Sequence, residues 1–342
     1  MNHFLRAMVV ILLVWDGSLP EGLAPQGAVS GVVGRGGSQE FIVLGWTWVL
    51  KCALFPNIAG GSTLPMLWRR SKHGVFNIAH RGARSLAPEN TLAAARKALE
   101  CGADMWEIDV CLTRDCELVV VHDDSLERTS NAKDIRPERN RWRVHEFSLE
   151  EIRRLDFGSW FIDTDPFGQI AAGWVSREEA ASYAGEPAPT LEDALLFTRR
   201  HDWLINVEIK DQASTPGDAV IVDKVVSTIE NLDMEQRVIV SSFRHDYLEK
   251  LRTLNPHIAV GALVLQLPAD IVGLLRRLGA EACHIHHSAV DSASIFHLHA
   301  WGFKVLVWTV NDEGMMRSLI DAGADGLFTD FPQNLTRILE FA

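Results

Sequence analysis

The sequence predicts an α/β fold of the (β/α)8 or TIM-barrel class, in which eight parallel strands alternate with helices. Short apolar runs alternate with amphipathic stretches from residue 76 to the C-terminus. This span of about 265 residues is close to the usual size of such barrels, about 250 residues. Polar and ionisable residues end several of the apolar runs, where a parallel barrel assembles its active site. These three observations favour one barrel domain with a site at the strand ends.

Nine segments have the composition of β-strands, one more than the barrel needs. They are residues 76–80, 105–110, 117–123, 204–210, 237–243, 259–265, 282–287, 304–310 and 326–331. Too few residues separate the second segment from the third for a crossover helix, so we expect these two to form an antiparallel hairpin at the barrel rim. The connecting segments with the clearest helical pattern are residues 91–104, 245–255, 269–280 and 311–325.

Two regions lie outside this alternation. The barrel is expected to occupy residues 71–342, with an insertion at about 125–190 that follows the hairpin. Residues 1–70 form a predicted N-terminal extension with two apolar runs, 7–15 and 41–50, each too short to span a bilayer. Three interpretations of the extension compete: a signal-like or membrane-surface anchor, a partly disordered segment, or residues upstream of a start at Met66.

The composition restricts the partners and the compartment. The formal charge is −12, and residues 1–70 hold five Lys or Arg against three Asp or Glu, which leaves 28 against 42 for the rest. This acidic main body argues against nucleic acid as a partner, and membrane contact is expected only through the extension. The five cysteines are odd in number and fit no zinc spacing, so we expect free thiols and a cytoplasmic location, with a signal-like or membrane-associated N-terminus as the alternative.

The hairpin brings acidic groups and a histidine together. Side chains alternate between the two faces of a strand, so Glu107 and Asp109 share one face. If the turn is centred on Arg114 and Asp115, Glu107 lies opposite His122, with Cβ atoms about 5 Å apart. The sequence therefore predicts two carboxylates and a histidine on one patch.

The same alternation adds further groups at the barrel mouth. Glu208 and Lys210 share a face, and His80 with Arg81 ends the first strand. Three crowded carboxylates repel one another unless a cation lies between them, and hard oxygen ligands suit Mg²⁺ or Ca²⁺. Two basic side chains beside that cation indicate that an anion joins them, and a phosphate fits the whole set.

Other residues of the mouth have two interpretations each. Trp308 and Phe243 could form an apolar wall for the substrate, or they could fill the core. His284 and His286 resemble the His-x-His ligand pair of zinc hydrolases on barrels, but those enzymes carry the pair on the first strand, so we interpret these histidines as pocket lining or as support for it. Asn90 or Thr91 is expected to cap the next helix, and Asn90 also lies within reach of the site.

Several motifs taken together closely resemble the glycerophosphodiester phosphodiesterase family. They are AHRGARSLAPENT, WEIDVCLTRDCELVVVHDDSLERTS, INVEIK, VSSF and VLVWTVN followed by GADGLFTDFP. The resemblance extends from about residue 76 to 335 in the family's order and does not include residues 1–70. It implies a barrel that hydrolyses a small-molecule glycerophosphodiester to sn-glycerol 3-phosphate and an alcohol.

The resemblance also implies roles for seven residues. They comprise a general acid/base pair, three ligands of a divalent metal ion and two phosphate-binding cations. In that order they are His80 and His122; Glu107, Asp109 and Glu208; and Arg81 and Lys210. The insertion is expected to cover the substrate and to influence its selection.

Three alternatives remain at this stage. A lysophospholipase D-like enzyme would keep the fold and act on lipid substrates, with an apolar groove at the mouth. A non-catalytic ligand-binding barrel is disfavoured because each expected catalytic position holds the expected residue type. A zinc amidohydrolase is disfavoured because the first strand ends in His-Arg-Gly.

Overall fold

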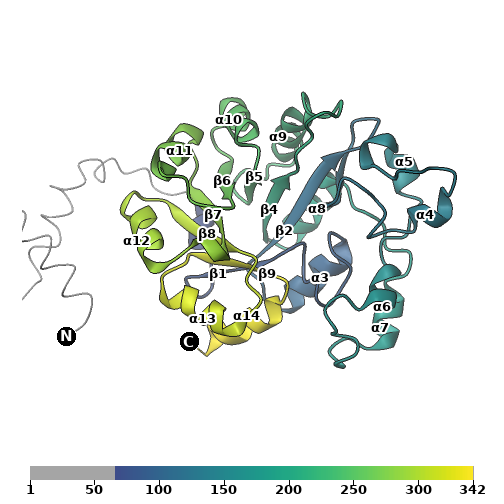
Figure 1. Cartoon of the computed structure of the whole chain (residues 1–342), viewed down its shortest axis with the longest axis horizontal. Coiled ribbons are helices and arrows are strands. Elements are labelled where there is room, and N and C mark those ends of the chain that lie inside the picture. The colour runs from purple at the N-terminus through teal and green to yellow at the C-terminus, as the bar shows by residue number, and fades with distance from the viewer. Residues whose placement is uncertain (1–65, 342) are drawn as a thin grey trace, which may run out of the picture. The chain divides into compact units, whose positions relative to one another are not determined.

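The computed structural model describes residues 66–341, and in them eight parallel strands close into a barrel (Figure 1). The strands are β1 (Phe76–Ala79), β2 (Met105–Leu112), β4 (Leu204–Ile209), β5 (Val238–Ser242), β6 (Ala259–Val264), β7 (Ala282–His286), β8 (Lys304–Trp308) and β9 (Gly326–Thr329). Strand β1 pairs with both β2 and β9, which closes the ring. The predicted fold class is confirmed. The predicted extension, apart from its last residues, lies outside the described residues.

A helix leads from each barrel strand to the next and a last one follows β9, as the strand–helix alternation predicts. The helices are α3 (Leu92–Glu100), α8 (Leu191–Arg200), α9 (Ile221–Asn231), α10 (His245–Leu254), α11 (Ile271–Leu278), α12 (Ser292–Ala300), α13 (Glu313–Asp321) and α14 (Pro332–Glu340). Thr91 caps α3 by accepting a hydrogen bond from the backbone N–H of Ala94, which decides between the two predicted caps. Within residues 66–341, no helix has the length and apolar character needed to cross a membrane.

The hairpin at the rim is present, but its register differs from the prediction. Strand β3 (Leu118–Val120) runs antiparallel to the end of β2, with Val110 paired to Val120. The pairing is shifted by one residue, so the predicted opposition of Glu107 and His122 is wrong. The loop contains a third residue, Cys116, whose φ of +60° places it in the left-handed region. A loop of three residues with a left-handed last residue shifts the pairing by one position relative to a two-residue turn.

The barrel interior is apolar at the N-terminal end of its strands and polar at the other end. One layer of inward-facing side chains comes from all eight strands: Phe76, Ile78, Met105, Leu204, Ile239, Ala259, Ala282, Leu306 and Phe328. Leu67 and Trp68, from the 3-10 helix η1 (Met66–Arg69), pack against this layer although they precede the predicted barrel boundary. The buried apolar layer leaves the carboxyl ends of the strands as the place for ionisable groups.

The insertion after the hairpin is built from short helices. They are α4 (Ala132–Ile135), η2 (Val144–Glu146), α5 (Leu149–Ile152), α6 (Trp160–Thr164) and α7 (Arg177–Ser182). One small core joins Phe147 and Ile152 to the outer side of the hairpin, and a second joins Phe161 and Tyr183 to α3. Figure 1 shows these helices gathered beside β2 and α3, at one edge of the barrel. The insertion is therefore anchored next to the strand that carries the first two acidic residues.

Candidate active site

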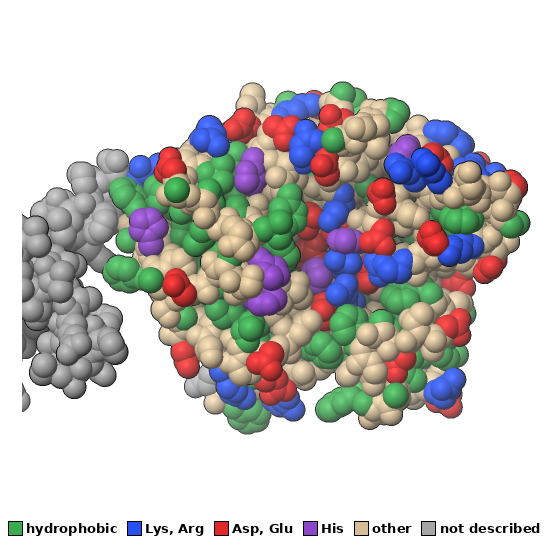
Figure 2. All heavy atoms as spheres, in the orientation of Figure 1, with side chains coloured by type: hydrophobic (Ala, Val, Ile, Leu, Met, Phe, Trp, Pro, Cys, Tyr) green, Lys and Arg blue, Asp and Glu red, His purple; other side chains and the backbone are tan. Residues whose placement is uncertain are grey.

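A pocket of about 110 Å³ opens at the carboxyl ends of the strands. Eight of the nine predicted site residues line it: His80, Arg81, Glu107, His122, Glu208, Lys210, Phe243 and Trp308. The ninth, Asp109, contacts Arg81 and Lys210 from the side. Figure 2 shows histidine, acidic and basic side chains gathered near the centre of the visible face. The sequence-based residue set thus lies together in one place.

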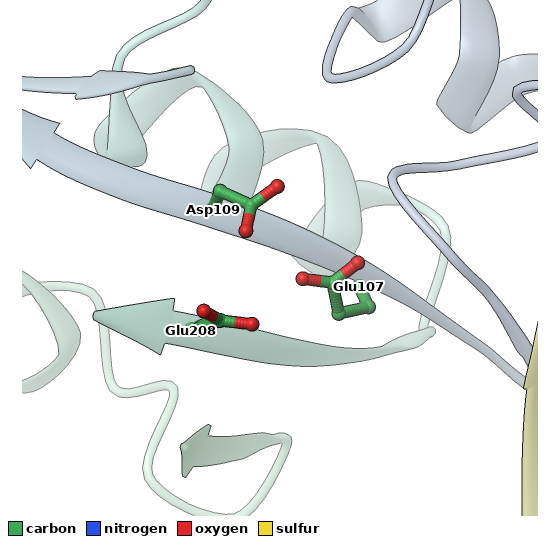
Figure 3. A group of neighbouring side chains, drawn as sticks. All are labelled: Glu107, Asp109 and Glu208. Carbon is green, nitrogen blue, oxygen red and sulfur yellow. The ribbon is translucent and has the colours of Figure 1, made fainter. Parts of the chain in front are cut away.

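Glu107, Asp109 and Glu208 form a compact acidic cluster. One carboxylate oxygen from each residue lies within 4.8 Å of the others. Figure 3 shows Glu107 and Asp109 on β2 beside Glu208 on the neighbouring strand β4. The parallel register pairs Asp109 directly with Glu208, and Glu107 lies one pleat further along the same face. Strand alternation and register are sufficient to bring the three carboxylates together.

Burial makes this cluster unfavourable without a cation. Burial, reinforced by Asp109 and Glu208, raises the pKa of Glu107 well above its usual range, and burial and Asp109 raise the pKa of Glu208. Burial alone would also raise the pKa of Asp109, but Lys210 and Arg81 hold it below its usual range.

The donor set of the cluster fits a metal ion. Among the residues that the structure describes, Glu107 Oε1 is buried and has no hydrogen-bond partner. An orphaned carboxylate oxygen next to two further carboxylates is the donor set of a hard divalent cation. The cluster could therefore hold a divalent metal ion.

Two cations flank the acidic cluster. Lys210 Nζ lies 2.7 Å from Glu208 Oε1 and 3.4 Å from Asp109 Oδ1. Arg81 Nε lies 3.4 Å from Asp109 Oδ2, and the Arg81 backbone N–H donates a 2.8 Å hydrogen bond to Glu107 Oε2. Because both side chains also line the pocket, they can bind an anion that bridges them and the cation site.

The two predicted proton-transfer histidines have the same arrangement. His80 Nδ1 lies 2.7 Å from Asp330 Oδ1, and His122 Nδ1 lies 2.7 Å from Asp123 Oδ1. An ionised carboxylate can only accept, so the proton lies on Nδ1 and Nε2 is left available in the pocket. Burial, together with Arg81, lowers the pKa of His80 to about 4 despite its carboxylate partner. His80 is therefore a neutral imidazole that can accept a proton at Nε2.

Some residues of the site were given no role from the sequence, and Asn90 was placed within reach of the site without a partner. Asn90 donates to Asp109 Oδ2 at 2.9 Å and accepts from the Asp109 backbone N–H at 3.2 Å. It does so with a left-handed φ of +57°, a conformation that asparagine tolerates better than most residues. The carboxylates of Glu89, Asp123 and Asp330 were not assigned either. Asp123 and Asp330 did give a sequence signal, because each lies at or next to the end of a predicted strand segment.

An aromatic wall forms one side of the mouth. The rings of Phe243 and Trp308 pack edge to face, with their centroids 5.5 Å apart. The Trp308 indole N–H donates a 3.0 Å hydrogen bond to the His284 carbonyl. Phe243 is 42% exposed, so it stands at the entrance rather than in the core. His286 packs against Trp308 at 4.9 Å and supports this wall. Both aromatic residues therefore belong to the pocket.

The floor of the pocket contains unpaired polar groups. His284 is fully buried, and neither of its ring nitrogens has a hydrogen-bond partner within residues 66–341. Asn206 donates to Ser241 Oγ at 2.8 Å, while its own Oδ1 is likewise unpartnered in the described part of the chain. The imidazole fits because residue 261 is glycine: a Cβ there would lie 2.1 Å from His284 Nε2. Both residues line the pocket, so its floor holds polar atoms that no group of the described residues satisfies.

His284 should make the fold sensitive to acid. Burial lowers its pKa to about 3, whereas the unfolded chain has the ordinary value of about 6.5. Between these values the unfolded state binds one more proton, so the free energy of unfolding falls as the pH falls, by up to about 1.4 kcal/mol per pH unit. We expect His284→Gln to reduce this slope by about that amount in urea titrations between pH 6 and pH 4. The control is His297→Gln, at an exposed position. If the free energy of unfolding depended on pH equally in the two variants, His284 would not be held in its neutral form by burial.

Comparisons with known proteins identify the family. Residues 80–334 match the glycerophosphoryl diester phosphodiesterase family. The chain is 34% identical over 263 residues to a glycerophosphodiester phosphodiesterase of Caldanaerobacter subterraneus subsp. tengcongensis, covering 77% of this chain and 96% of that protein. It is also 34% identical over 267 residues to a glycerophosphodiester phosphodiesterase of Bacillus altitudinis, covering 77% and 97%.

A solved structure agrees with these sequence relatives. The structure of an Oleispira antarctica phosphodiesterase in complex with the product sn-glycerol-3-phosphate superposes with a TM-score of 0.63 at 30% identity. The similarity covers 78% of this chain and 96% of that one. The resemblance inferred from the sequence motifs is confirmed. The chain belongs to the glycerophosphoryl diester phosphodiesterase family, and with it to the phosphoric diester hydrolases.

Proposed function

We propose that this protein hydrolyses glycerophosphodiesters to sn-glycerol 3-phosphate and an alcohol, and that it requires a divalent metal ion. The observation that carries the proposal is the buried acidic cluster with an orphaned oxygen on Glu107, next to two cations and two carboxylate-paired histidines in one pocket. The product found in the Oleispira antarctica structure supports the choice of product for this chain.

Glu107, Asp109 and Glu208 would hold the ion, which is Mg²⁺ or Ca²⁺ by the chemistry of the donors. When bound, the ion supplies Lewis-acid stabilisation of negative charge on a phosphoryl oxygen. Arg81 and Lys210 would orient the phosphodiester and neutralise the charge that develops on its other oxygens. Lys210 can turn to the substrate from Glu208 because that carboxylate would then have a different partner.

His80 and His122 would move the protons. One imidazole takes a proton from the attacking hydroxyl through Nε2, and the other gives a proton to the departing alcohol oxygen. Asp330 and Asp123 would hold each ring in the tautomer that leaves Nε2 facing the substrate. The attacking group is water, or first the glycerol 2-hydroxyl with a cyclic phosphate that water then opens. Both routes use the same two histidines.

The unpaired polar groups of the floor support glycerol as the retained part of the substrate. A hydroxyl both donates and accepts, which matches the neutral His284 ring and the free Oδ1 of Asn206. We expect Asn206→Ala to raise KM for glycerophosphocholine by about fivefold, since a hydrogen bond contributes about 1 kcal/mol. Hydrolysis of bis(p-nitrophenyl) phosphate, which has no hydroxyl, should change less than about twofold. An equal effect on both substrates would contradict this role; the exposed Asn231→Ala is the control.

The function is tested by incubating the purified chain with glycerophosphocholine and Mg²⁺ or Ca²⁺, and by identifying the products. We expect sn-glycerol 3-phosphate and choline. Release of glycerol and phosphocholine would place the cleavage on the other side of the phosphorus, and the absence of turnover with glycerophosphodiesters of several alcohols would reject the proposal.

A lysophospholipase D-like activity is the second candidate. The observation that favours it is the apolar entrance, where the pocket-lining Phe243 is 42% exposed; Leu265, which directly follows β6, is 61% exposed. Choline release from lysophosphatidylcholine at a rate comparable to that from glycerophosphocholine would support it. Binding of the full chain to lipid vesicles, lost on deletion of residues 1–65, would assign the membrane contact to the predicted extension.

We also propose a cytoplasmic location. Four cysteines of the described part are free thiols: Cys101, Cys111, Cys116 and Cys283. Free thiols that include half-buried positions persist in a reducing compartment. Localisation of a tagged full-length chain tests this proposal, and an extracellular or membrane fraction would contradict it.

A further inference from the structure

Both proton-transfer histidines connect to one buried carboxylate that lies outside the pocket. We propose that Glu89 is a positioning residue for His80 and His122, and that it acts through Arg84 and Arg128. The proposal deepens the proposed function and rests on it for the roles of the two histidines.

Glu89 is the centre of an arginine cluster. It lies in the loop between β1 and α3 and is 6% exposed. Its carboxylate accepts hydrogen bonds from Arg81 at 2.9 Å, from Arg84 at 3.4 Å, and from the two terminal nitrogens of Arg128 at 2.9 and 2.7 Å. Although burial opposes ionisation, these arginines hold the pKa of Glu89 below its usual range. One ionised carboxylate therefore fixes three guanidinium groups.

The first branch leads to His80. Arg84 donates through Nε to Asp330 Oδ1 at 2.5 Å and through its terminal nitrogen to Asp330 Oδ2 at 3.2 Å. Asn311 donates to the same carboxylate at 2.7 Å. Asp330 then pairs with His80 Nδ1. A planar fork bound through two nitrogens sets the plane of the carboxylate, and the carboxylate sets the plane of the imidazole.

The second branch leads to His122 and repeats the same pattern. Arg128 donates through Nε to Asp123 Oδ2 at 2.7 Å and through a terminal nitrogen to Asp123 Oδ1 at 3.2 Å. Asp123 pairs with His122 Nδ1. Arg128 comes from the insertion, so that segment contributes to the position of a histidine that follows the hairpin strand β3. Within residues 66–341, the carboxylate of Glu89 is the group that the two branches share.

The arrangement indicates positioning rather than direct contact with substrate. Glu89, Arg84 and Arg128 are absent from the residues that line the pocket, so they act on the reaction through other groups. A network that served stability alone would need no second contact from each arginine to the partner of a histidine. A small displacement of a catalytic group can cost a large factor in rate, which gives the network a function.

The test uses leaving groups of different quality. Glycerophosphocholine has a poor leaving alcohol that needs a proton, whereas glycerol 3-(p-nitrophenyl phosphate) releases p-nitrophenolate without one. Removal of the general acid should therefore cost much less kcat on the second substrate, whereas removal of the general base should lower kcat on both.

His80→Ala and His122→Ala give the reference pattern for each histidine. We expect Arg84→Met to follow the His80 pattern, Arg128→Met to follow the His122 pattern, and Glu89→Gln to combine both. The expected loss in kcat for each arginine variant is about 10- to 100-fold, the usual effect of a residue that orients a functional histidine.

Conservative and remote variants serve as controls. Arg84→Lys and Arg128→Lys keep the charge and should recover part of kcat. Glu281, at the amino end of β7, is another carboxylate that accepts two hydrogen bonds from an arginine, Arg252. Glu281→Gln should leave kcat unchanged for both substrates. If Glu89→Gln does not fold, the two arginine variants still decide the question. The proposal would be overturned if both arginine variants lost the same factor in kcat on the two substrates, so that neither followed the general-acid pattern. It would also be overturned if neither variant lost activity.

A readout without turnover separates this proposal from the proposed function. In ¹⁵N-histidine-labelled protein, the protonated Nδ1 signals of His80 and His122 are assigned from the alanine variants. We expect Arg84→Met to shift only the His80 signal, Arg128→Met only the His122 signal, and Glu89→Gln both. If these shifts occurred in a protein that does not hydrolyse glycerophosphodiesters, the positioning role of Glu89 would be supported and the proposed substrate would be wrong. Unshifted signals in an active enzyme would reject the network alone.

Discussion

Replacing His80 or His122 with alanine should lower kcat for glycerophosphocholine by about 10²–10⁴-fold, the contribution expected of a positioned proton-transfer group. Each imidazole is held at Nδ1 by a carboxylate and directs Nε2 into the pocket, so its removal deletes a proton acceptor or donor at the reacting atoms. KM should change little, because Arg81, Lys210 and the acidic cluster remain. Steady-state kinetics on the purified variants measure both parameters.

Two further observations make this prediction specific. The exposed His297→Ala should keep the wild-type kcat, and circular dichroism should show that all three variants are folded. A kcat within about threefold of wild type for either His80→Ala or His122→Ala would remove that residue from the proton-transfer pair.

Excess chelator should lower kcat/KM by about 10³-fold, since Lewis-acid stabilisation by a metal ion is worth several kcal/mol. Without a cation, Glu107 and Glu208 have raised pKa values and tend to bind protons, so the pocket loses the positive charge that would face the phosphoryl oxygen. Addition of Mg²⁺ or Ca²⁺ in excess over the chelator should restore activity. The chelated protein should keep its circular dichroism spectrum, because the barrel core does not include the acidic cluster.

Turnover that continues unchanged in excess chelator would remove the metal from the mechanism. Restoration by only one of the two cations would identify the ion that the site uses. Loss of both activity and fold would instead assign a structural role to the ion.

The alternation of side chains along strands explains why most of the site could be predicted. In a parallel barrel all strand ends meet at one face, so Glu107, Asp109, Glu208 and Lys210 had to converge once the strands were recognised. The hairpin register could not be predicted in the same way, because one left-handed residue, Cys116, decided the length of its loop.

Loops and small residues account for what the sequence did not reveal. Glu89 and Arg128 lie in a loop and in the insertion, and no period in the sequence fixes the path of either segment. The position of His284 depends on the space left by Gly261 on the neighbouring strand, a relation visible only after the register is known. Asn90 was within reach of the site from its position, but its pairing with Asp109 required the actual loop conformation.

The central claim, that three carboxylates hold a divalent cation which binds the phosphodiester, is tested most directly by calorimetric titration of the metal-free protein with Mg²⁺ and Ca²⁺. We predict one ion per chain, with release of protons because the pKa values of Glu107 and Glu208 are raised in the metal-free state and a bound cation would lower them, and loss of binding in Asp109→Asn and in Glu208→Gln. No saturable binding to the wild-type protein, or the same binding in both variants, would contradict the claim.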